Sequence, residues 1–256
     1  MKKIPSKLAS VLIEKSDFYN CPKFINDDPI KIPHSFSKKE DIEISAFLSA
    51  IIAWGNRTSI IKNAKRLMVL IDNSPYSFIT QSQGKELLPI LKFVHRTFNG
   101  NDCLDVIHSL KQIYNEYGGL ENVFTKGYKK TNSVAGSIIF FREIFMKNIE
   151  LPRTGKHISD VTKGSAAKRL NMFLRWMIRK DDKGVDFGLW SKIPMSALKI
   201  PLDVHTGNIS RKLGLLKRKQ NDWKAVLELT DNLLLIDSQD PVRLDFALFG
   251  MGVYES

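Results

Sequence analysis

The spacing of apolar residues along the chain is mostly that of helices. Segment 42–54 (IEISAFLSAIIAW) is apolar at nearly every position, which predicts a buried helix. Further helical patterns are separated by turn-rich joints such as NGND and YGG. They cover residues 60–71, 85–98, 103–117, 119–128 and 134–146. Strand-like alternation is rare, so the sequence predicts an all-α protein without internal repeats.

Features near the two ends of the sequence also predict helices. Residues 1–15 (MKKIPSKLASVLIEK) are typical of an amphipathic helix and not of a secretory signal. Pro241 stands at the first position of a last helical pattern, which Gly250 and Gly252 are expected to end. No apolar run is long enough to cross a bilayer.

The two cysteines, Cys21 and Cys103, are far apart and belong to no C-x-x-C spacing. This argues against a disulfide framework, an iron–sulfur loop and a zinc site. Proteins with so few cysteines are typical of a reducing compartment, so we expect a cytoplasmic protein with no metal site.

Positive charge is concentrated in one part of the chain. The formal net charge is +12, and residues 152–220 contain 16 Lys and Arg against 5 Asp and Glu. A local excess of this kind favours a polyanionic partner, most often nucleic acid. The alternative is a generally basic surface with no specific partner.

Residues 165–179 predict a helix with two different faces. Ala167, Leu170, Leu174 and Met177 form an apolar stripe, and a second stripe of donors contains Lys168, Asn171, Arg175 and Arg179. Gly164 precedes the lysine by four residues, and a glycine at a helix start lets backbone N–H groups approach an anion such as phosphate. The simpler interpretation is a solvated basic face after a glycine turn.

Asp203 precedes a second basic helical segment, VHTGNISRKLGL. Its position predicts an N-cap, a role that is compatible with a fixed, ionised carboxylate in a catalytic site. A lysine amine can attack an aldehyde-like carbon, and a nearby carboxylate can stabilise the cation that forms. His205 has no second ligand at helical spacing and is expected to be structural.

These motifs resemble the helix-hairpin-helix superfamily of DNA glycosylases, the endonuclease III-like group. The family hairpin L-P-G-x-G-x-K-T-A is similar to TKGSAAKRL, with Gly164 and Lys168 at the matching offset. The family motif V-D-x-H-V-x-R is similar to LDVHTGNISR, with Asp203 and His205, and the family's L-L-S-A-Q helix is similar to AFLSAIIAW. The overall pattern also resembles an uncharacterised bacterial branch and, in its long connection, archaeal 8-oxoguanine DNA glycosylase.

Four departures from the family pattern stand out. Ala166 replaces the second hairpin glycine, the leading proline is missing, and Ile51 replaces the glutamine that fills the gap left by a flipped base. The lysine and the aspartate are separated by a longer connection than in most members. These departures leave open a DNA-binding helix-hairpin-helix protein without catalysis.

The resemblance implies two helical subdomains with a DNA-binding cleft between them. We expect a middle bundle over 41–171 that ends in the hairpin, and a second subdomain made of 1–40 and 172–256. In this arrangement a damaged nucleotide would flip out of the stack to reach the site.

The resemblance also implies base-excision repair chemistry. Lys168 would be the Schiff-base nucleophile of a DNA glycosylase and abasic-site lyase, and Asp203 would stabilise the oxocarbenium ion, without metal or organic cofactor. The partner would be double-stranded DNA with a damaged base or abasic site, bound by a monomer. The residues expected to contact DNA are Lys163, Gly164, Ser165, Arg169, Arg175, Arg211 and Lys212.

Other interpretations remain open at this stage. The same basic surface could serve an RNA- or nucleotide-acting protein, or a basic protein-interaction module. Trp54, Trp176 and Trp190 could stack on a base, although each is more often a core residue. Asp186 could read a base or cap a short helix.

Overall fold

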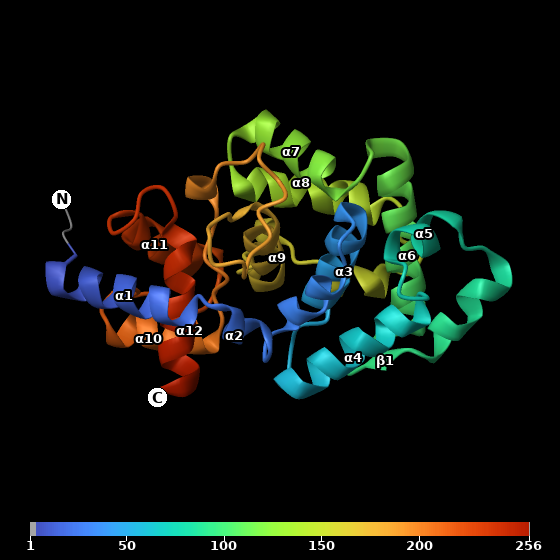
Figure 1. The fold of residues 1–256 in the computed structure, drawn as a ribbon. Helices are drawn as coiled ribbons and strands as arrows, with labels where there is room; N and C mark the ends of the chain where they lie inside the picture. The colour runs from blue at the N-terminus through green and yellow to red at the C-terminus, as the bar shows by residue number, and fades with distance from the viewer. Residues whose placement is uncertain (1–3, 256) are drawn as a thin grey trace. The chain divides into compact units, whose positions relative to one another are not determined.

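The computed structural model describes residues 4–255, and helices dominate it, which confirms the all-α prediction (Figure 1). The only strands in this range are the two-residue strands β1 (Val94–His95) and β2 (Phe98–Asn99), which pair antiparallel. Among the helices of the described residues, none is long and apolar enough to cross a membrane.

The chain divides into two compact units. Unit 1 contains the described residues through Phe24 and those from Asp160 onward, and unit 2 contains Ile25–Ser159. The sequence predicts boundaries at 41 and 171 instead. In the structure the division falls before helix α9 (Lys168–Ile178), so the whole of this helix lies in unit 1.

Unit 2 is built around α3 (Lys39–Ile51), which is buried along most of its length. Phe47 of this helix contacts Phe141 and Phe145 of α8, with ring centroids 5.5 and 5.7 Å apart. The other elements of unit 2 are η1 (Pro29–Lys31), η2 (Pro33–Ser35), α4 (Arg57–Leu70), α5 (Pro75–Gln81), η3 (Gly84–Lys92), α6 (Gly100–Tyr117), α7 (Leu120–Thr131), α8 (Val134–Met146) and η4 (Pro152–His157).

Unit 1 joins the first helix of the chain to the last ones. Helices α1 (Ser6–Tyr19) and α12 (Leu244–Tyr254) lie side by side (Figure 1). Leu12 packs in an apolar core with residues of α10, α11 and α12 such as Ile209, Leu229 and Leu248. The remaining elements are η5 (Val161–Lys163), η6 (Met195–Ala197), α10 (Val204–Lys212), α11 (Trp223–Leu234) and η7 (Pro241–Arg243), and α2 (Pro22–Ile25) lies at the first boundary between the units.

The prediction that glycines end the last helix is wrong. Gly250 and Gly252 both lie inside α12. A Cβ at Gly250 would lie 2.3 Å from the ring of Tyr19, and a Cβ at Gly252 would lie 3.0 Å from Cβ of His205. These glycines therefore allow α12 to pack closely against α1 and α10, and the second contact brings the last helix against the helix that Asp203 begins.

Candidate functional site

A tight turn leads into helix α9. The side chain of Asp160 accepts hydrogen bonds from the backbone N–H and the hydroxyl of Thr162. Gly164 then adopts φ +82, a left-handed conformation that suits glycine. Apart from Gly164 and its two chain neighbours, no atom lies within 4 Å of the Cβ position it lacks. The hydroxyl of Ser165 accepts from the N–H of Ala167, and α9 begins at Lys168. The backbone of this turn is therefore open on the side of Gly164.

Lys168 and Asp203 come together in the structure. The ammonium nitrogen Nζ of Lys168 lies 3.9 Å from Oδ2 of Asp203, although the two residues are 35 positions apart in the sequence. Their side chains are 30% and 21% exposed. Partial exposure leaves both groups accessible to a ligand, while the surrounding protein limits the solvent screening of their charges.

The backbone explains why the carboxylate is fixed in this place. Asp203 is the N-cap of α10, and its Oδ1 accepts from the N–H of Thr206 at 2.9 Å, which confirms the predicted cap. Oδ2 is the oxygen nearest to Lys168. One oxygen thus holds the helix start and the other faces the amine, so the capping and chemical roles are compatible.

The loop before α11 supports both halves of the site. The N–H of Trp223 donates to the carbonyl of Gly164 at 3.0 Å, and Asp222 forms a β-bridge with Ser165. The side-chain amide of Asn221 donates to the carbonyl of Asp203 at 2.9 Å. The segment before α11 therefore contacts the glycine turn and the aspartate. In the sequence, this segment is distinguished only by its lysine and arginine residues.

The predicted row of exposed donors along α9 is wrong beyond its first residue. Asn171, Arg175 and Arg179 are 1%, 4% and 2% exposed. Arg175 donates to Asp186 at 3.3 Å and to Asp245 at 2.6 Å. The apolar and polar stripes of this helix are both covered, because carboxylates from later segments pair with the arginines. Arg175 is therefore committed to internal ion pairs and is not available for a phosphate.

Arg179 is the centre of the same ionic network. Its guanidinium lies 2.7 Å from Asp181, 3.1 Å from Asp186 and 2.8 Å from Asp240. Asp186, which the sequence left between base reading and helix capping, binds both arginines in the structure. The network connects α9 with the start of the last helical segment and holds Lys168 on a rigid element.

Asp245 lies next to the lysine–aspartate pair. It is 5% exposed, and burial raises its pKa to about 6. The charge of Arg175 lowers this pKa, but by less than burial raises it. The charge of Asp203 raises this pKa further, and the charge of Lys168 lowers it. Thr206 connects the two carboxylates, because its hydroxyl donates to Asp245 at 3.5 Å while its N–H donates to Asp203. Three charged groups are thus electrostatically coupled.

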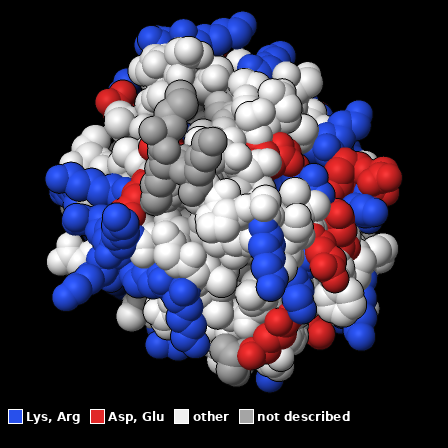
Figure 2. Space-filling model, turned by 90° about the vertical axis from the view of Figure 1, so that its left-hand side faces the viewer, with Lys and Arg blue, Asp and Glu red and all other residues white. Residues whose placement is uncertain are grey.

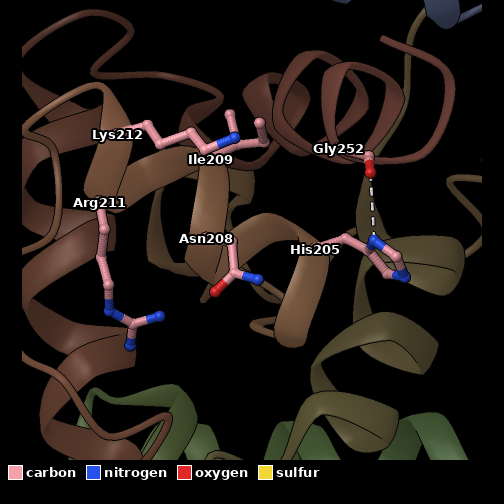
Figure 3. Close-up of a pocket in the computed structure, with 6 residues that line it drawn as sticks. All are labelled: His205, Asn208, Ile209, Arg211, Lys212 and Gly252. Carbon is pink, nitrogen blue, oxygen red and sulfur yellow. Dashed lines mark hydrogen bonds between the residues drawn. The ribbon is translucent and has the colours of Figure 1, made fainter. Parts of the chain in front are cut away.

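The outer face of α10 lines a pocket of about 340 Å³ with one residue of α12, Gly252 (Figure 3). One ring nitrogen of His205 lies 3.1 Å from the carbonyl oxygen of Gly252, which agrees with the expected structural role. Arg211 donates to the carbonyl of Arg218 and to the side chain of Asn221, at 2.8 and 2.5 Å. The side chain of Lys212 is exposed at the edge.

The other predicted residues vary in accessibility. Lys163 and Gly164 are exposed, and Ser165 is partly buried. Arg169 is also partly buried, and burial lowers its pKa to about 10. Trp176 and Trp190 are core residues with 0% and 1% exposure, so neither can stack on a base, whereas Trp54 is partly buried and packs on His157.

Basic side chains are not spread evenly over the one face that Figure 2 draws. On the face drawn in Figure 2, Lys and Arg gather at the left of the view, whereas acidic and basic groups alternate at the right. Within residues 4–255, no group of three or more His, Cys, Asp or Glu side chains is placed to hold a metal ion.

The fold and the site define a mostly helical protein in which a lysine–aspartate pair lies beside an open glycine turn. A family model described as "Protein of unknown function (DUF2400)" matches residues 28–254, and the chain belongs to this family. Searches of the curated proteins and of the solved structures found no match. All residues of the site lie within the matched range.

Proposed function

We propose that this protein is a DNA glycosylase with abasic-site lyase activity. The observation that carries the proposal is the distance of 3.9 Å between Nζ of Lys168 and Oδ2 of Asp203, two residues that distant segments bring together. A nucleophilic amine beside a fixed carboxylate is an arrangement that suits substitution at a sugar carbon. The resemblance to helix-hairpin-helix glycosylases assigns the same two positions to the same chemistry.

In the proposed reaction, Asp203 stabilises the positive charge that develops on the sugar as the base leaves. The glycosidic bond breaks with its electron pair on the departing base, which takes up a proton. Lys168, after loss of a proton, forms a bond from Nζ to C1′, and the sugar ring opens to a Schiff base. Loss of a proton from C2′ then expels the 3′ phosphate, and water releases the lysine.

The surroundings of the pair fit a DNA substrate. The turn at Gly164 has open space on the side that a Cβ would occupy, and Lys163 is exposed beside it. The N–H groups of Gly164 and Ser165 donate to carbonyls within the turn. In the proposal this turn is the hairpin that holds a phosphate. Arg169, Arg211 and Lys212 supply further positive charge, which attracts the backbone without reading sequence.

A non-catalytic DNA-binding protein is the second candidate. The observations that favour it are Ala166 in place of the second hairpin glycine and Ile51 in place of glutamine. Ile51 is 1% exposed, so it does not fill a gap in DNA in this conformation. This candidate uses the same turn and the same charges but forms no covalent intermediate.

Borohydride trapping on duplexes with an abasic site or 8-oxoguanine separates the two candidates. Borohydride reduces a Schiff base to a stable amine, so a covalent adduct requires a primary amine as the nucleophile. We expect an adduct with the wild type and with the control Lys192→Gln, an exposed lysine of the same unit, and none with Lys168→Gln. DNA binding without an adduct would favour the second candidate, and an adduct with Lys168→Gln would exclude Lys168 as the nucleophile.

A further inference from the structure

The loop Lys217–Asp222 is attached to the candidate site at two points. Its C-terminal end joins the glycine turn, through the N–H of Trp223 on the carbonyl of Gly164 and the bridge between Asp222 and Ser165. Its other attachment is the amide of Asn221 on the carbonyl of Asp203. These contacts fix the position of the loop relative to the turn that is proposed to bind phosphate.

Hydrogen bonds also fix the shape of the loop. Both oxygens of Glu228 accept backbone N–H groups, from Lys217 at 2.7 Å and from Arg218 at 3.3 Å. The guanidinium of Arg218 binds both oxygens of Asp222, and this pairing lowers the pKa of Asp222 to about 2. Arg211 donates to the carbonyl of Arg218. Arg218 therefore stabilises the loop through its hydrogen bonds, and Asp222 largely neutralises its charge.

The two lysines on either side of Arg218 have a different environment. Lys217 and Lys219 are exposed, and neither ammonium group forms an ion pair with the described part of the chain. The acidic groups of the loop and its support, Asp222 and Glu228, are engaged with Arg218 and with backbone N–H groups. A structured loop thus presents two uncompensated positive charges beside the turn.

We propose that Lys217 and Lys219 form a second phosphate-binding element, which extends the contact with the backbone of duplex DNA beyond the glycine turn. The inference rests on the proposed function, since the turn and the loop would bind one DNA. A lysine ammonium is a compact point charge that suits phosphate oxygens without demanding a fixed geometry. Because the hydrogen bonds of the loop already fix its shape, DNA binding does not carry the entropic cost of ordering the loop backbone.

The test is the salt dependence of binding to a duplex that contains a stable abasic-site analogue, measured by fluorescence anisotropy. The slope of log K against log salt is negative, and each phosphate contact adds about 0.9 to its magnitude. Lys217→Ala/Lys219→Ala should therefore reduce this magnitude by about 2. The control Lys62→Ala/Lys65→Ala removes the same charge from exposed positions of α4 in unit 2 and should leave the slope unchanged.

A loop variant with the wild-type slope would overturn the inference, as would an equal loss of slope in the control pair. Borohydride trapping should persist in the loop variant at saturating concentration, because Lys168 and Asp203 are intact. A wild type that forms the adduct while the loop variant keeps its slope would disprove only the role of the loop. A wild type that fails to bind DNA would disprove the proposed function together with this inference.

Discussion

Arg175 of α9 donates to Asp245 of α12 at 2.6 Å across 70 positions of sequence. Its guanidinium also lies over the ring of Phe246, 4.4 Å from the ring centroid. A buried ion pair of this kind stabilises the fold only if both partners remain, because loss of one leaves an uncompensated charge. The ion pair holds α9, which begins at Lys168, against α12, and its strength depends on whether Asp245 is ionised.

The first prediction concerns the pH dependence of stability. Burial raises the pKa of Asp245 from 3.8 to about 6, so the folded state holds a proton that the unfolded state has lost between these values. Ionisation of this carboxyl group therefore lowers the free energy of unfolding as the pH rises from 4 to 6, by about 2 kcal/mol of the about 3 kcal/mol that the full shift represents. The ionised form therefore stabilises the fold less than the protonated form does, and ionisation in the folded state is half complete near pH 6.

Asp245→Asn removes this titration and keeps a side chain that can bind Thr206. The stability difference between variant and wild type should change in favour of the variant by about 2 kcal/mol between pH 4 and pH 7. Urea unfolding at both pH values, followed by circular dichroism, measures it. Parallel pH profiles for the two proteins would mean that Asp245 does not titrate in this range.

The second prediction concerns Arg179, whose guanidinium is shared by three carboxylates. Arg179→Met keeps most of the volume but leaves these negative charges without their cation. We expect a loss of about 3–5 kcal/mol in the free energy of unfolding, the range for breaking a buried ion pair. The exposed control Lys192→Met should change it by less than about 0.5 kcal/mol. A loss as small as the control's would show that the network contributes little.

The helices and the cap of Asp203 could be predicted because they depend on local sequence. Segment 134–146 has the helical period and becomes α8, and Asp203 holds the N-cap that its place before α10 indicates. Segment 85–98 has the same period but forms η3 followed by the β1–β2 pair. Pro89 lacks the N–H that a continuous α-helix requires, and tertiary packing decided the rest.

The ionic network could not be predicted in the same way. On a helical wheel Arg175 and Arg179 look exposed, because a wheel contains no information about segments that pack on the helix later. Their partners Asp186, Asp240 and Asp245 lie up to 70 positions away. The helical wheel and the cap position indicate Lys168 and Asp203 one at a time, and the resemblance to a known family assigns both to one site.

The third prediction separates the two roles of Asp203. Asparagine caps a helix about as well as aspartate, so Asp203→Asn should change the free energy of unfolding by less than about 1 kcal/mol. Loss of the negative charge should slow base release by at least about 100-fold, because the cationic transition state loses its stabilisation. Release of a damaged base, compared with Asp28→Asn at a cap in unit 2, measures the effect.

The same variant should behave differently on a preformed abasic site. The open-chain aldehyde needs no stabilised cation, so Lys168 should still form the borohydride adduct on this substrate. Loss of adduct and base release together would mean that Asp203 acts on Lys168 itself and not only on the sugar. Unchanged base release would remove Asp203 from the mechanism.

The last prediction concerns the open side of the glycine turn. Gly164 has φ +82 with no atom within 4 Å of a Cβ position, so Gly164→Ala costs only backbone strain, about 1 kcal/mol. Gly184 has φ +71 and equally open surroundings, so Gly184→Ala should cost a similar amount.

If a phosphate approaches the turn at Gly164, the added methyl group must obstruct it. Gly164→Ala should then weaken binding to abasic-site duplex at least about tenfold, equivalent to 1.4 kcal/mol. Gly184→Ala should bind normally, and equal affinities for the two variants would place the phosphate elsewhere.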